Sequence, residues 1–185
     1  MREDTAVLAS RDRRIAVAGV IGFAVALAAA SQVAIPVPGT SVPMTLQPLA
    51  VVLAGICLGP GAGAASMVLY LAAGAAGLPV FAPEGLPGAA RLVGPTGGYL
   101  LAYPLGAFAA GWIVRHRPRR FAWRALAAAC GIALIHLGGV AQLAVLTGSL
   151  RRAVVLGSLP FLGMDAVKAV LAALYSPRFS DRAPA

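Results

Sequence analysis

Two oppositely charged residues lie inside the last long apolar stretch of the chain, Gly157 to Tyr175. Lys168, the only lysine of the sequence, follows Asp165 by three positions. On a helix this spacing places both side chains on one face, where they can pair with each other or bind a polar ligand together. A buried ion pair that fixes helix register would explain them. Each charge costs roughly 2.5 to 3.5 kcal/mol at a bilayer centre, so we favour the ligand clamp.

Thr45 and Gln47 stand where the second apolar segment begins, after the prolines Pro36, Pro38 and Pro43. The prolines hold the preceding chain extended and outside a regular helix. Helix capping and hydrogen bonds between helices would explain both residues without a ligand. A glutamine also offers a donor and an acceptor together, which suits an amide-like solute. Taken alone, the two interpretations are about even.

Three further residues are candidates for the walls of a binding pocket. Arg91 can attract an anionic substrate, although a lone arginine in a loop is more simply explained as solvated. Tyr70 and Tyr99 can line the pocket, but tyrosines near a membrane interface also act as anchors. His136 and Gln142 are assigned to contacts between helices, because no Cys, Asp or Glu lies near them in sequence to complete a metal site.

The composition predicts an all-α membrane protein. Of 185 residues, 59% are hydrophobic and 11% are charged, a balance far from that of soluble domains. At about 20 residues per crossing, the chain accommodates six transmembrane helices within residues 15–175, with a cytoplasmic segment at 1–14 and a tail at 176–185. The six apolar segments are Ile15 to Ile35, Thr45 to Leu58, Gly61 to Ala76, Gly97 to Val114, Arg124 to Thr147 and Gly157 to Tyr175.

The arginines predict the orientation of these helices. A formal net charge of +9 raises the question of nucleic acid, but the arginines gather in short clusters between apolar segments, which membrane topology explains better. With a cytoplasmic N-terminus, the inner side collects most of them and the outer side receives only Arg91, Arg151 and Arg152. Both termini are therefore expected inside. Asp165 then lies roughly 12 Å into a last helix that begins outside, within reach of a pocket open to the exterior.

Small residues are expected to let the helices approach closely, for example Gly55 with Gly59 and Ala107 with Gly111. In the first helix, Ala24, Ala28 and Ala30 leave a smooth face that can contact another membrane subunit. Cys57 and Cys130 lie in apolar segments, and no second ligand lies at a usable spacing, so a disulfide or a metal site is not favoured. The sole lysine follows a valine, so no phosphate-binding loop is present and energy-driven transport requires partner subunits.

Several runs together resemble the BioY family, the biotin-capturing S components of energy-coupling-factor (ECF) transporters. The resemblance covers about Ile15 to Leu174. The runs, in order, are Gln32 to Pro36, Val42 to Gln47, Leu53 to Gly55 with Leu58 and Gly59, Gly77 to Ala82, Gly94 to Leu100, and Pro160 and Phe161 with Asp165 and Lys168. One departure is Gly163-Met164-Asp165, where the family often has Pro-Gly-Asp.

The resemblance implies a six-helix bundle in the bacterial inner membrane that binds biotin from outside. It also implies a non-enzymatic subunit without cofactor or metal, working with a transmembrane coupling subunit and two ATPase subunits, or as a homo-oligomer. Asp165 and Lys168 match the family residues that contact the vitamin. An S component for another vitamin remains an alternative. An intramembrane enzyme using Asp165 is a second, but the spans hold no other carboxylate and no convincing nucleophile with its base.

Overall fold

A computed structural model describes residues 2–117 and 120–175, and the predicted tail at 176–185 lies outside them. The regular secondary structure of these residues is helical apart from a two-stranded hairpin, in which β1 (Ala34–Ile35) pairs antiparallel with β2 (Met44–Thr45). The helices are α1 (Arg2–Gln32), α2 (Gln47–Leu58), α3 (Pro60–Ala75), α4 (Ala90–Val93), α5 (Gly97–His116), α6 (Phe121–Thr147), α7 (Leu150–Gly157), the 3₁₀ turn η1 (Leu159–Phe161) and α8 (Leu162–Leu174).

Among the residues that the structure describes, four segments are long and apolar enough to cross a membrane: Arg13–Gln32, Gly97–His116, Phe121–Thr147 and Leu150–Leu174. Two shorter apolar helices, α2 and α3, have 12 and 16 residues, or about 18 and 24 Å at 1.5 Å per residue. They meet at Gly59, whose φ of 81° lies in the left-handed region that favours glycine. The predicted helical membrane class is confirmed, with two of the six predicted spans shorter than a bilayer core of about 30 Å.

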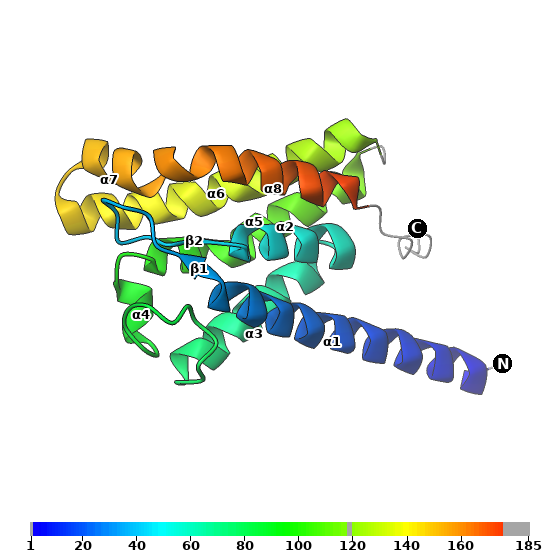
Figure 1. The fold of residues 1–185 in the computed structure, drawn as a ribbon. Coiled ribbons are helices and arrows are strands. Elements are labelled where there is room, and N and C mark those ends of the chain that lie inside the picture. The colour runs from blue at the N-terminus through cyan, green and yellow to red at the C-terminus, as the bar shows by residue number, and fades with distance from the viewer. Residues whose placement is uncertain (1, 118–119, 176–185) are drawn as a thin grey trace.

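The elements are distributed unevenly along the bundle. Figure 1 shows the start of α1 and the end of α8 at one end, while the β1–β2 hairpin, α4 and α7 gather at the other. This arrangement agrees with the prediction that both ends of the membrane domain face one side. The loop between β1 and β2 and the segment that carries Arg91 in α4 share the opposite side.

Glycines bring the helices into backbone contact, as their spacing predicts. A Cβ built at Gly131 of α6 would lie 2.8 Å from the carbonyl oxygen of Gly106 in α5. A Cβ at Gly55 of α2 would collide with the carbonyl of Ala107, and one at Gly111 would lie 2.7 Å from the Gly55 oxygen. These contacts confirm close packing at Gly55, Ala107 and Gly111, and they stack α2, α5 and α6 tightly beneath the pocket.

The face predicted for a partner on α1 is partly turned inward. Ala24 is only 8% exposed and belongs to the main core cluster, and Ala28 packs against that cluster. The prediction that Ala24, Ala28 and Ala30 form an outer contact surface is therefore wrong for Ala24, whereas Ala28 and Ala30 are partly exposed. The cause is the helical period: Ala24 lies one turn before Leu27, which is fully buried against the bundle.

The last span is interrupted, contrary to the continuous helix expected from Gly157. Its first helix, α7, begins earlier, at Leu150, where the Ser149 side chain accepts a hydrogen bond from the Arg152 amide. The chain then passes through η1, which contains Pro160, before α8 begins at Leu162. Proline has no N–H to continue a hydrogen-bond ladder. Asp165 consequently lies in the first turn of α8, where the helix dipole favours a negative charge.

Candidate substrate-binding site

A cavity opens among α2, α5, α6 and α8 and the loops around α4, lined by both polar and apolar side chains. It contains six of the seven residues predicted for the site. Those six are Thr45, Gln47, Arg91, Tyr99, Asp165 and Lys168, and other lining residues include Val42, Met44, Phe81, Tyr103, His136 and Phe161. The seventh, Tyr70, lies behind the wall and contacts Gln47.

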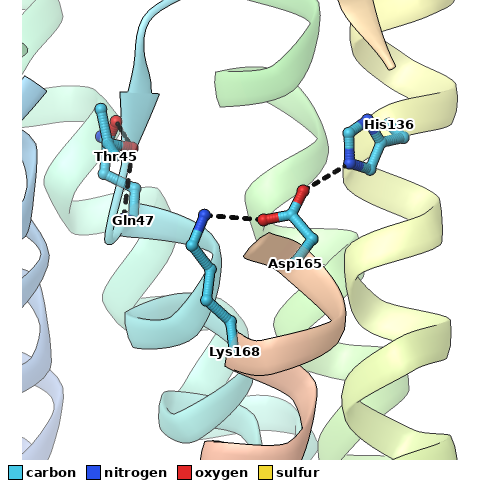
Figure 2. Close-up of polar contacts among 5 residues, drawn as sticks. All are labelled: Thr45, Gln47, His136, Asp165 and Lys168. Atoms are coloured by element: carbon cyan, nitrogen blue, oxygen red, sulfur yellow. Dashed lines mark hydrogen bonds and ion pairs between the residues drawn. The ribbon is translucent and has the colours of Figure 1, made fainter. Parts of the chain in front are cut away.

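Asp165 is held by hydrogen bonds to both carboxylate oxygens, as Figure 2 shows. The Lys168 ammonium donates to Oδ1 at 2.7 Å, and His136 Nε2 lies 2.7 Å from Oδ2. Asp165 is 5% exposed and Lys168 is 3% exposed. The spacing of the two charged residues therefore produces the predicted contact, inside the cavity rather than in lipid.

The wall facing this pair carries the second polar group of the site. Thr45, at the end of β2, donates through Oγ1 to Gln47 Oε1 at 3.1 Å. Gln47 Nε2 in turn donates to the Tyr70 hydroxyl at 2.9 Å. Because Gln47 is buried and its oxygen and one N–H are occupied, the geometry leaves its second amide N–H for a ligand.

Arg91 is built into the site. Placed by the short helix α4, it is 4% exposed and donates through Nη1 to the carbonyl of Glu84 and through Nη2 to that of Ala82, at 2.8 Å for the latter. The interpretation of Arg91 as a solvated loop residue is wrong, because the loop folds over its side chain. Burial lowers the pKa of Arg91, and the nearby Tyr70 and Glu84 oppose that shift. Arginine nevertheless stays cationic in proteins.

Tyr99 holds the chain at the break between α7 and α8. Its hydroxyl donates to the carbonyl of Gly157 at 2.5 Å, directly before the break between α7 and α8. The ring occupies a slot that exists because residues 139 and 157 are glycines: a Cβ at Gly139 would collide with the ring, and one at Gly157 with the hydroxyl. Tyr99 therefore lines the cavity and also holds the chain at the break that precedes α8, the helix that carries Asp165.

His136 is the site residue that sequence reasoning missed. It was assigned to contacts between helices, yet it lines the cavity and pairs with Asp165 from α6. One signal was available: a polar side chain in the middle of an apolar span marks a functional position as readily as a charge does. Gln142, assigned in the same way, does bridge elements, since its Nε2 donates to the carbonyls of Leu92 and Gly94.

The site can bind a small polar molecule with an apolar body. It offers a carboxylate, two cations and an amide N–H, separated by apolar and aromatic walls. Within residues 2–117 and 120–175, no group of three His, Cys, Asp or Glu side chains is placed to hold a metal ion. The arrangement is that of a binding pocket with several charge-assisted hydrogen bonds.

Fold and site together define a multi-pass membrane protein with a buried, polar ligand pocket near one end of its helical bundle. A solved structure shares this fold: "the S-component for biotin from an ECF-type ABC transporter" superposes with a TM-score of 0.79 at 24% identity, over 89% of each chain. The chain belongs to the BioY family, whose sequence model matches residues 4–185.

Two relatives illustrate the similarity. The "Biotin transporter BioY" of Thermotoga maritima is 40% identical over 144 residues, which cover 78% of this chain and 84% of the relative. That of Rhizobium etli is 34% identical over 141 residues, covering 72% and 75%. The similarity therefore extends over most of the membrane domain and agrees with the resemblance noted in the sequence.

Proposed function

We propose that this chain captures biotin and takes part in its uptake as the substrate-binding S component of an ECF transporter, without catalysing a reaction. The observation that carries the proposal is the buried Asp165–Lys168 ion pair, because both of its side chains line the cavity. Membership of the BioY family and the names of the relatives support biotin as the ligand.

The chemistry of biotin fits the pocket. Its ureido ring has two N–H donors and one carbonyl, which suit a fixed carboxylate and a cation, and its fused rings and aliphatic chain suit the apolar walls. The charges also match: counting Arg91 and Lys168 as +1 each and Asp165 as −1 leaves +1, the complement of a single carboxylate. We assign Asp165, Lys168, Gln47, Thr45, Arg91 and Tyr99 to the ligand, with Tyr70 holding Gln47.

The proposal includes the cellular setting. The cavity lies at the end of the bundle away from the start of α1 and the end of α8, which suits capture from outside a bacterial inner membrane when the termini are cytoplasmic. Release to the inside requires energy, which we assign to a transmembrane coupling subunit and two ATPase subunits. If the chain works without these subunits, we expect it to form a homo-oligomer.

Equilibrium binding to the purified protein in detergent tests the proposal. We expect saturable binding of biotin with a stoichiometry of one and at least 100-fold weaker binding of thiamin and riboflavin. Preference for thiamin or riboflavin would assign the site to another vitamin. Absence of binding by all three, in protein that melts cooperatively, would refute substrate capture.

A further inference from the structure

His136 reaches the substrate site from a different helix than the residues it contacts. Asp165 and Lys168 both belong to α8, whereas His136 lies in the middle of α6, 29 positions earlier in the sequence. Its Nε2 lies 2.7 Å from Asp165 Oδ2, and Lys168 occupies the other oxygen. The carboxylate is therefore held from two helices at once (Figure 2).

The second contact restricts a motion that Lys168 alone leaves free. The terminal torsion of an aspartate is broad, so one hydrogen bond to Oδ1 does not fix the plane of the carboxylate. A donor at Oδ2 from another helix does fix it. It also fixes the separation of α6 and α8 at the level of the cavity.

The surroundings of the imidazole show that Asp165 is its main polar contact. The side chain is 13% exposed. Tyr99 lies edge-on, with ring centroids 6.2 Å apart, and Phe161 lies at 6.4 Å on a tilted plane. Nδ1 is buried and has no hydrogen-bond partner among the residues that the structure describes.

We propose that His136 is a positioning residue of the substrate site: through its Nε2–H it holds the Asp165 carboxylate in the one orientation that receives the ligand. This inference rests on the proposed function of the pocket. It adds a residue to the site that acts through Asp165, and it explains why a polar side chain occupies the middle of an otherwise apolar span.

Two amide substitutions at the same position test the inference. In His136→Gln the side-chain amide reaches about as far as Nε2 and can still donate to Asp165 Oδ2. In His136→Asn the amide stops near the position of Nδ1, one methylene short. Both variants bury an amide on α6, so the difference between them reports the contact with Asp165.

We expect His136→Gln to bind biotin within about 3-fold of the wild-type dissociation constant and His136→Asn to bind it at least 10-fold more weakly. Melting temperature without ligand is measured beside affinity. Equal affinities in the two variants, whether both weak or both unchanged, would overturn the positioning role. If His136→Asn does not accumulate in membranes, His136→Phe, which also lacks the donor, takes its place with the same expected loss.

The outcome for the wild-type protein separates this inference from the function on which it rests. A wild-type chain that binds thiamin or riboflavin in place of biotin refutes the biotin assignment, and the Gln and Asn variants are then compared with that vitamin. A wild-type chain that binds biotin tightly, together with variants of equal affinity, refutes only the role of His136.

Discussion

Neutralising the Asp165–Lys168 pair separates its effect on stability from its effect on binding. Three variants are needed: Asp165→Asn, Lys168→Met and the double variant. Asp165→Asn leaves the Lys168 ammonium buried beside a neutral amide, and Lys168→Met leaves the carboxylate with His136 as its side-chain partner among the described residues. The double variant removes both charges, while the new asparagine oxygen still accepts from His136.

The structure gives the expected magnitudes. The pair is 2.7 Å apart with both side chains almost fully buried, and removing one member of such a pair costs about 3–5 kcal/mol. At 2–4 °C per kcal/mol for a chain of this size, each single variant should melt roughly 6–20 °C below the wild type. The double variant has no unpaired charge, so most of this loss should be recovered.

Binding should not recover with stability. Truncating one partner of a buried, charged contact costs about 2–5 kcal/mol of affinity, which raises the dissociation constant roughly 30-fold to 4,000-fold. The double variant should bind biotin at least as weakly as the single variants, because it lacks both charged groups.

The two free cysteines provide the stability assay. Cys57 in α2 and Cys130 in α6 are partly buried, so a thiol-reactive fluorogenic dye reports unfolding in detergent. Titration calorimetry measures biotin affinity on the same preparations. Single variants that melt within 2 °C of the wild type would refute a stabilising pair, and a double variant with wild-type affinity would refute the ligand clamp.

Three further substitutions probe the walls of the cavity. Arg91→Gln removes a buried cation and two hydrogen bonds to loop carbonyls. We expect biotin affinity to fall at least 10-fold in binding titrations, and an unchanged affinity would remove Arg91 from the site. Gly139→Ala places a methyl group in the Tyr99 ring and should lower stability by about 1–3 kcal/mol in thermal denaturation; a wild-type melting temperature would show that the slot is loose. Tyr70→Phe deprives Gln47 of its acceptor. It should lower stability by about 1–3 kcal/mol and weaken biotin binding by less than 10-fold, and a larger loss would place Tyr70 in direct contact with the ligand.

The sequence predicted the parts of the fold and site that depend on local patterns. Hydropathy gave the helical membrane class, and the spacing of Asp165 and Lys168 gave their contact, because residues three apart on a helix share a face. The spacing of small residues gave the close approach at Gly55, Ala107 and Gly111. Each of these depends on one helix or on a short-range period.

The remaining features depend on contacts between distant segments. The pairing of His136 with Asp165 joins α6 to α8, and the burial of Arg91 requires the loop that supplies the Ala82 and Glu84 carbonyls to fold over it. The break before α8 is held by Tyr99 from α5. No periodic pattern within a single segment encodes such contacts, so they became visible only in three dimensions.

An experimental structure of the protein with biotin bound tests the central claim most directly. The account predicts biotin in the cavity among α2, α5, α6 and α8, with a polar atom of the vitamin within about 3.2 Å of Asp165 or Lys168. Biotin bound elsewhere, with Asp165, Lys168 and His136 hydrogen-bonded only to one another, would contradict it.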